Sequence, residues 1–276
     1  MINILEALTQ IKAAAQNNNT PAMQELAFSC IDLTTLSHTD TESSVAQFTQ
    51  RVNDFADDYP QLSHVAAICV HPNMVETVKE NLAVDGVNIA SVAGGFPASQ
   101  TFLAIKTMEA ALAMENGADE IDIVLSLSNF LDDKLEDCLD EIELIKETIA
   151  PAHLKVILES GTLHDAEMIY KASKLAIRGG ADFIKTSTGK TTPAATPEAA
   201  IAMCLAIKDH YAITGEKIGF KPAGGISTTE DAILYLTIVK EILGEEWLNP
   251  QLFRIGASRL ANNLLSDLTG EQVNYF

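Results

Sequence analysis

Basic residues are scarce in this chain. Its 18 lysines and arginines stand against 38 aspartates and glutamates, which gives a formal net charge of −20 over 276 residues. Phosphate backbones and anionic membranes bind basic faces, so we expect neither nucleic acid nor a membrane surface as a partner. A small anionic substrate needs only a local positive pocket and stays possible. No run of about 18 apolar residues occurs, so no membrane span is predicted.

Targeting and disulfide patterns are also missing. The segment MINILEALTQIKAAAQNNNT has no basic region followed by an apolar stretch, so no secretory signal is predicted. A chain of this length does not need disulfides, and none of its cysteines forms a C-x-x-C pair. We therefore expect reduced thiols in a cytoplasmic protein. The four cysteines are Cys30, Cys69, Cys138 and Cys204.

Histidine spacings typical of a metal site are absent as well. The histidines form no H-x-H or H-E-x-x-H group, which a divalent metal site is expected to display. We therefore expect no metal and no other cofactor. The six histidines are His38, His64, His71, His153, His164 and His210.

Short β-branched runs alternate with amphipathic stretches, and no linker divides the chain. Glycine follows the helical stretches 100–116 and 229–243, and Thr196-Pro197-Glu198 is typical of a helix start. Eight β–α units predict one α/β domain, a (β/α)₈ TIM barrel over residues 1–276. Residues 1–25 would form an extra N-terminal helix, over the barrel bottom or at a dimer contact, and 270–276 a tail. The expected strands are 28–32, 65–70, 88–92, 120–124, 155–158, 183–186, 218–221 and 253–255.

An open doubly wound sheet is the structural alternative. Such a sheet predicts a glycine-rich dinucleotide turn after its first strand. After Asp32 the chain instead continues Leu33-Thr34-Thr35-Leu36, with no glycine. The barrel is therefore the better interpretation.

Charged residues interrupt several of the expected strands. Buried parallel strands normally read as continuous apolar runs, and lysine and aspartate are seldom fully buried without partners. Alternation along 120–124 places Asp122 on the same face as Glu120, toward the barrel interior. Because barrel enzymes keep their active sites at the carboxyl ends of strands, such a cluster indicates catalysis. The residues are Asp32, Asp122, Lys155, Lys185 and Lys221.

Two of these lysines end neighbouring strands. A solvated lysine has a pKa near ~10.4, so only about one in 2,500 carries the free amine at pH 7. Burial and a nearby cation both lower the pKa of a lysine. Of Lys185 and Lys221, one would be the nucleophile and the other its cationic activator. Asp122 and Lys155 could relay a proton through water, or they could simply neutralise each other in the core.

The chain resembles the deoxyribose-phosphate aldolase family, class I enzymes that form a Schiff base, over nearly its whole length. The resemblance implies that Lys185 forms the imine, that Lys221 lowers its pKa, and that Asp122 and Lys155 relay the proton. It also implies substrate contacts from Asp32, Thr34, Cys69 and Thr188, a possible homodimer, and a part in deoxyribonucleoside catabolism. The phrases that carry it are AFSCIDLTTL (27–36), HVAAICVHP (64–72), NGADEIDIV (116–124), LKVILESG (154–161), GGADFIKTSTGK (179–190), GFKPAGGI (219–226) and FRIGASRL (253–260).

A phosphate site is expected in the loops after the last three strands. Glycines there let backbone N–H groups approach an anion, as barrels commonly do late in the chain. Familiar bacterial members have an arginine where this chain has Ser227, so we expect Arg259 to supply the missing charge. Several relatives end in a tyrosine implicated in proton exchange, and Tyr275 is the candidate here. The expected phosphate-binding residues are Gly189, Lys190, Gly224, Gly225, Gly256, Ser258 and Arg259.

Two other functions stay open. Another Schiff-base barrel lyase, such as a transaldolase or a dehydratase, would keep the nucleophilic lysine and act on different carbonyl compounds. A non-catalytic phosphosugar-binding barrel would need the glycine loops without the paired lysines. The co-occurrence of FIKTSTGK and GFKPAGG favours the aldolase over both.

Overall fold

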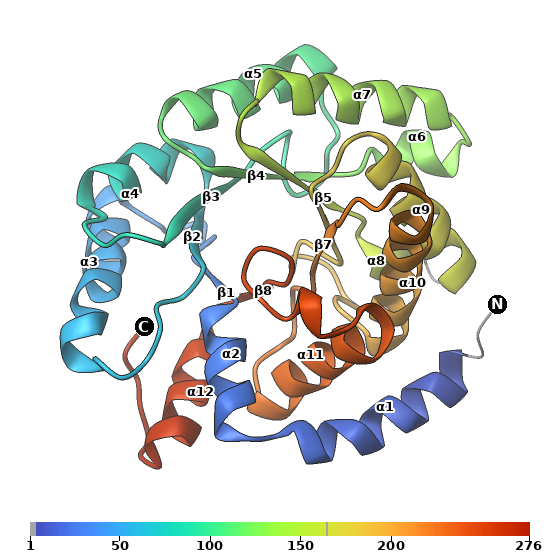
Figure 1. Ribbon diagram of the computed structural model, residues 1–276. Helices are drawn as coiled ribbons and strands as arrows, with labels where there is room; N and C mark the ends of the chain where they lie inside the picture. Colours follow the sequence, from blue (N-terminus) through green and yellow to red (C-terminus); the bar gives the residue numbers. More distant parts are fainter. Residues whose placement is uncertain (1–3, 164) are drawn as a thin grey trace.

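In the computed structural model, which describes residues 4–163 and 165–276, eight parallel strands form a barrel ringed by helices (Figure 1). His164 and residues 1–3 of the expected N-terminal extension lie outside the described residues. The strands are β1 (Ile31–Thr34), β2 (Ala67–Val70), β3 (Asn88–Val92), β4 (Glu120–Val124), β5 (His153–Ile157), β6 (Phe183–Lys185), β7 (Gly219–Lys221) and β8 (Ile255–Ala257).

Helices connect successive strands and cover the outside of the barrel (Figure 1). They begin and end with the signals seen in the sequence: Thr196 caps α10, Pro197 occupies its first turn, and Gly244 ends α11. The helices are α1 (Ile4–Asn18), α2 (Pro21–Ser29), α3 (Glu42–Asp58), α4 (Val75–Asn81), α5 (Leu103–Glu115), α6 (Leu127–Leu131), α7 (Leu135–Thr148), α8 (Ser160–Leu163), α9 (Ala166–Arg178), α10 (Pro197–Thr214), α11 (Thr229–Leu243) and α12 (Arg259–Thr269), with short 3₁₀ turns η1 (Pro72–Met74) and η2 (Glu245–Trp247).

The sheet closes on itself. Strands pair in the order β7-β6-β5-β4-β3-β2-β1-β8, and parallel bridges from Phe220 to Phe253 and from Ala223 to Gly256 join the two ends. This closure confirms the predicted (β/α)₈ barrel and excludes the open doubly wound sheet. The register sets Lys185 opposite Lys221 across β6 and β7.

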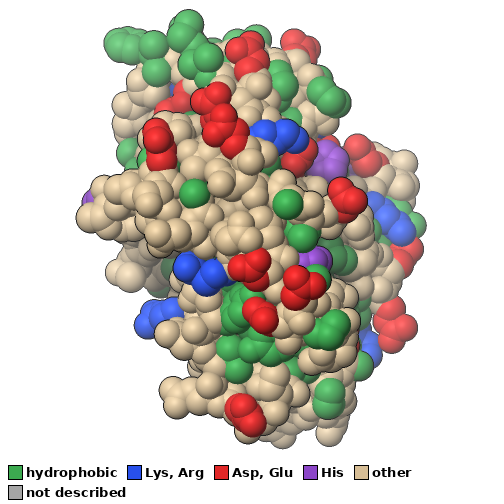
Figure 2. Space-filling view, turned by 90° about the vertical axis from the view of Figure 1, so that its left-hand side faces the viewer, with side chains coloured by type: hydrophobic (Ala, Val, Ile, Leu, Met, Phe, Trp, Pro, Cys, Tyr) green, Lys and Arg blue, Asp and Glu red, His purple; other side chains and the backbone are tan. Residues whose placement is uncertain are grey.

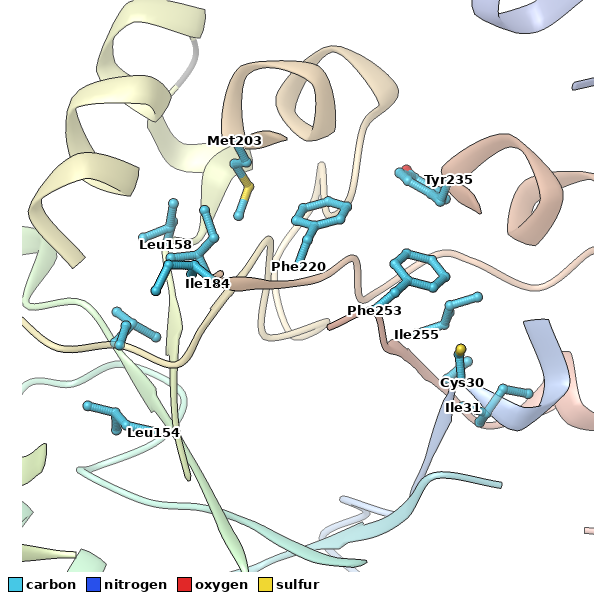
Figure 3. Close-up of a cluster of buried hydrophobic side chains, with 14 of the residues drawn as sticks. Cys30, Ile31, Leu154, Leu158, Ile184, Met203, Phe220, Tyr235, Phe253 and Ile255 are labelled. Carbon is cyan, nitrogen blue, oxygen red and sulfur yellow. The ribbon is translucent and has the colours of Figure 1, made fainter. Parts of the chain in front are cut away.

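The main hydrophobic core lies between the strands and the helix ring. In Figure 3, Ile184 and Phe220 of the barrel lie on the same side as Met203 of α10, and Phe253 lies near Tyr235 of α11. Burial of each such side chain stabilises the fold by about 1.5–3 kcal/mol. Alternation along the strands therefore turns the apolar residues outward to the helices and leaves the charged ones facing inward.

Both terminal strands begin later than predicted. The expected strand 28–32 is wrong at its start, because Phe28 belongs to α2 and stacks on Phe55 of α3. A short apolar run does not distinguish the end of a buried helix from a strand, so periodicity alone misplaces this boundary. At the other end, Phe253 contacts β7 through a single bridge and the regular strand starts at Ile255.

The N-terminal extension forms two helices where one was expected. The first, α1, packs against α10 and α11 and buries Leu8 and Ile11. It lies along the outside of the helix ring and not over the barrel bottom (Figure 1). The second, α2, packs between α11 and α12 and leads into β1.

Acidic side chains are scattered over the face in Figure 2, which includes α3, α4 and the C-terminus, and do not gather in one patch. None of the helices formed by the described residues is long and apolar enough to cross a membrane.

Candidate active site

Seven charged residues meet inside the barrel, and none is more than 4% exposed. They project from the inward faces of β1, β4, β5, β6 and β7 and from the residue before β8. The expected catalytic residues are all among them. The cluster consists of Asp32, Glu120, Asp122, Lys155, Lys185, Lys221 and Arg254.

Asp122 lies at the centre of this cluster. Its Oδ2 accepts hydrogen bonds from Lys185 Nζ at 2.7 Å and from Lys221 Nζ at 2.8 Å. Its Oδ1 accepts one from Lys155 Nζ at 3.1 Å. One carboxylate therefore connects the three lysines that the sequence analysis singled out.

A second layer of the cluster consists of Arg254, Asp32 and Glu120, and Arg254 with its ion pairs was not predicted from the sequence. Arg254 Nη1 lies 2.6 Å from Asp32 Oδ1, and Arg254 Nη2 lies 2.7 Å from Glu120 Oε1. Glu120 also pairs with Lys155, and Asp32 pairs with Lys221. Alternation was the available signal, because Phe253 and Ile255 face the helices and leave Arg254 facing inward.

The three lysines differ in their electrostatic surroundings. Burial and the neighbouring ammonium of Lys221 lower the pKa of Lys185, and they outweigh the attraction of Asp122. Burial also opposes the charge on Lys155 and Lys221, but nearby carboxylates, Asp122 foremost, raise the pKa of both. The same three ammonium groups outweigh burial at Asp122 and hold its pKa well below the usual range. Of these three lysines, Lys185 is the one whose surroundings lower the pKa.

A cavity of about 460 Å³ opens above the cluster at the carboxyl ends of the strands. Loops after β1, β6, β7 and β8 line it, and Lys185 is the one cluster lysine that reaches it. The structure thus brings all the expected phosphate-binding residues together, along with two expected substrate contacts. The predicted residues lining the cavity are Thr34, Lys185, Thr188, Gly189, Lys190, Gly224, Gly225, Gly256, Ser258 and Arg259.

Two of these loops approach each other closely. Gly224 has φ +84°, and a Cβ added to it would lie 3.0 Å from the Cα of Gly189. Only glycine adopts such a backbone readily and leaves this space free. The loop after β6 is also joined to the loop after β1, because Lys190 Nζ donates to the carbonyl of Leu36 at 2.6 Å.

Glu159 forms hydrogen bonds with the loop after β6 and was not predicted to have a role. It has φ +48°, which is uncommon for a residue with a side chain and is often found beside functional sites. Its carboxylate accepts from the Thr188 hydroxyl at 2.6 Å and from the Thr188 N–H at 3.2 Å. The Thr188 hydroxyl in turn accepts from the N–H of Lys190 at 3.0 Å.

Two expected substrate contacts lie deeper than the cavity lining. Asp32 is fully buried and pairs with Lys221 and Arg254. Cys69 is fully buried in a small apolar cluster with Leu36, and burial raises the pKa of its thiol. Facing inward places a side chain in the barrel interior but does not fix its depth along the barrel axis.

Tyr275 lies away from the cavity. Its hydroxyl donates to Asp58 at 2.8 Å, and its ring packs edge-on against Phe55 and Tyr59. These residues belong to the last part of α3 and its cap, which return to the amino ends of the strands. The tail is therefore docked at the end of the barrel opposite the cavity, so the structure does not bring the expected proton shuttle to Lys185.

A buried lysine at a cavity on the carboxyl ends of a (β/α)₈ barrel is an arrangement that suits lysine-dependent, Schiff-base-forming enzymes. The chain belongs to the DeoC/LacD family of aldolases, whose family model matches residues 26–241. Within the described residues, no three His, Cys, Asp or Glu side chains are placed to hold a metal ion.

Named relatives and a solved structure agree with this assignment. A putative deoxyribose-phosphate aldolase of Caenorhabditis elegans is 43% identical over 96% of this chain and 88% of its own length. The deoxyribose-phosphate aldolase of Homo sapiens is 45% identical over 86% of this chain and 78% of its own. The tetrameric deoxyribose phosphate aldolase of Aeropyrum pernix is 28% identical with a TM-score of 0.69, covering 93% of this chain and 96% of its own.

Proposed function

We propose that this chain cleaves 2-deoxyribose 5-phosphate into acetaldehyde and glyceraldehyde 3-phosphate through an imine on Lys185. The observation that carries the proposal is the placement of Lys185. It reaches the cavity and contacts Asp122 at 2.7 Å, while Lys221 lies on the same carboxylate oxygen. The names of the worm and human relatives support the substrate. The reaction would serve deoxyribonucleoside catabolism.

Lys185 starts the reaction as a free amine. Its nitrogen attacks the C1 aldehyde of the open-chain sugar to give a carbinolamine. A proton from the Asp122–Lys155 relay lets the carbinolamine hydroxyl leave as water, which gives the protonated imine. Cleavage of the C2–C3 bond sends its electron pair into this imine as the C3 hydroxyl loses its proton and becomes the new aldehyde. The enamine then takes a proton at C2, and hydrolysis releases acetaldehyde and restores the amine.

Asp122 and Lys155 are the groups proposed to move these protons. The two carboxylate oxygens of Asp122 contact different lysines, since Oδ2 faces Lys185 and Oδ1 faces Lys155 at 3.1 Å. A water molecule at the imine could exchange protons with this pair. Lys221 keeps its ammonium beside Lys185 and favours the neutral amine that begins the cycle.

The substrate phosphate is proposed to bind the glycine-lined side of the cavity. Gly189, Gly224 and Gly225 have positive φ and present bare backbone there. Arg259 and Lys190 line the cavity and would add positive charge there. Thr34 and Thr188 line the same cavity and would orient the sugar.

Reductive trapping tests the proposal. Acetaldehyde with borohydride should leave one ethyl group on Lys185, located by intact mass and peptide mapping, and Lys185→Met should abolish it. Release of glyceraldehyde 3-phosphate from 2-deoxyribose 5-phosphate then tests the substrate. Trapping without this release would favour another Schiff-base lyase. Absence of any adduct, where a known lysine aldolase is trapped, would favour a non-catalytic phosphosugar-binding barrel.

We further propose that the chain forms a homo-oligomer in the cytoplasm. The Aeropyrum relative is described as tetrameric, which supports self-association, and sedimentation of the purified protein would distinguish a dimer from a tetramer. The four cysteines are free and buried, which suits a reducing compartment.

A further inference from the structure

The charges of the buried cluster do not balance. Three carboxylates face four cationic side chains, so the fully ionised cluster holds one positive charge in excess. An uncompensated buried charge is costly, and release of one proton from a base removes it. The charge state of the cluster therefore depends on the number of its acids and bases as well as on the groups beside the cavity.

The contacts decide which base gives up the proton. Arg254 keeps its charge, because a guanidinium is not deprotonated in proteins. Lys155 pairs with Glu120 and Asp122, and Lys221 pairs with Asp32 and Asp122. Among the described residues, the ion pairs of Lys185 involve Asp122 alone. Lys185 is therefore the base held least firmly.

We propose that Arg254 and Glu120 are positioning residues that set the protonation of Lys185 from the second layer of the barrel, by fixing the charge balance of the cluster. The proposal rests on Lys185 being the nucleophile. Arg254 acts through Asp32 and Glu120, its two carboxylate partners, and contributes the fourth positive charge. Glu120 acts in the opposite sense.

Few other groups near Lys185 could gain or lose a proton in its place. From β2, Cys69 faces Lys185, but burial raises the pKa of its thiol, which stays neutral. From β3, Asn88 donates to Glu120 at 2.7 Å and carries no charge. From β6, the ring of Phe183 lies 5.9 Å from Lys155 Nζ and 5.8 Å from the Arg254 guanidinium. The remaining charged neighbours are Asp122 of β4, Lys221 of β7 and, through their ion pairs with these two, Lys155 of β5 and Asp32 of β1.

Substitutions of Arg254 and of Glu120 should change the net charge of the cluster in opposite directions, and the double substitution should cancel the two changes. Arg254→Met removes the excess positive charge, so Lys185 should hold its proton more firmly. The acid limb of the pH profile of kcat/KM should then move to higher pH by about one unit. At pH values below the new limb, kcat/KM should fall roughly tenfold. Glu120→Gln adds to the excess and should move the limb down by a similar amount. The double variant restores the original count and should return the limb close to its parental position.

Two controls separate charge from packing. Arg254→Lys keeps the charge and should keep the parental limb, even if it lowers stability. Arg178 and Glu136 form an exposed pair at 3.4 Å, so R178M and E136Q make the same substitutions outside the barrel and should shift nothing. Circular dichroism reports whether each variant folds. If R254M does not fold, E120Q still decides, because a limb that does not move down overturns the proposal.

The test also works without the proposed substrate. Formaldehyde with cyanoborohydride methylates accessible free amines, so the pH dependence of methylation at Lys185, followed by peptide mass, reports its protonation directly. Opposite shifts in R254M and E120Q with no cleavage of 2-deoxyribose 5-phosphate would support this inference and reject the proposed function. A uniform loss of activity with parental limbs, or shifts that the double variant does not cancel, would overturn it.

Discussion

Replacement of Lys221 by methionine should separate the role of its charge from the rest of the site. Methionine keeps much of the length of the side chain and removes the ammonium. Lys221 is fully buried, and its partners are Asp32 and Asp122. The change therefore removes the cation that disfavours a proton on Lys185 and leaves the cavity lining in place, because Lys221 lies below the lining.

The magnitude follows from the shared oxygen of Asp122. Lys185 Nζ and Lys221 Nζ lie 2.7 and 2.8 Å from Oδ2, so the two nitrogens are at most about 5.5 Å apart. Two unit charges at that distance repel by about 3 kcal/mol at an effective dielectric constant of about 20. Loss of this repulsion raises the pKa of Lys185 by about two units. Below that pKa the free-amine fraction falls about 100-fold.

The assay is the pH profile of kcat/KM for cleavage, with the yield of acetaldehyde trapped on Lys185 measured at each pH. In K221M, both acid limbs should move up by about two pH units, and activity should recover toward the parental value at high pH. Lys171 forms an exposed pair with Asp133 at 2.8 Å, so K171M is the matched control and should leave both limbs unchanged.

A limb that stays at the parental pH in K221M, with activity lost equally at every pH, would refute the electrostatic argument. Lys221 would then act by contacting the substrate or by supporting the fold. Thermal unfolding distinguishes these two, since removing one partner of a buried ion pair destabilises a protein by about 3–5 kcal/mol.

Four further changes test other parts of the structure. Arg259→Ala should raise KM for the phosphorylated substrate about tenfold and leave turnover of unphosphorylated 2-deoxyribose unchanged, because Arg259 lines the side of the cavity proposed to bind phosphate; an unchanged KM would remove it from the proposed site. Glu159→Gln should weaken the hold on Thr188 and raise the same KM severalfold, whereas equal losses on both substrates would indicate a purely structural role. Tyr275→Phe removes the hydrogen bond to Asp58 and should lower stability by no more than about 1 kcal/mol with kcat within twofold; loss of proton exchange at C2 would mean that the tail reaches the cavity in solution. Finally, kcat/KM should rise modestly with salt from low ionic strength, since a net charge of −20 repels phosphorylated substrates, while a steady fall would mean that the local basic groups dominate.

Periodicity predicted the barrel and the inward faces of the two strands that carry Asp122 and Lys155. Asp122 and Lys155 were expected to face the interior, and the structure confirms both. The late-strand glycines were expected at one phosphate site, and they line one cavity. These features are local, because alternation and helix boundaries are determined by neighbouring residues.

Depth and long-range pairing could not be predicted in the same way. Alternation places Asp32 and Thr34 on the same face of β1, yet Asp32 is fully buried while Thr34 reaches the cavity. Arg254 was missed because its partners are distant in sequence, and no local pattern indicates that an inward arginine will meet Glu120. The docking of Tyr275 against α3 likewise depends on a contact between the two ends of the chain.

The Arg254 contacts also bear on when the barrel interior can form while the chain is being synthesised. Asp32 lies 222 residues before Arg254, and Glu120 lies 134 residues before it. A ribosome therefore delivers both acids long before Arg254, and their hydrogen bonds to its guanidinium cannot form until the last strand emerges. Nascent chains that end before β8 should remain protease-sensitive, and protection should develop late and cooperatively once residue 254 has left the exit tunnel.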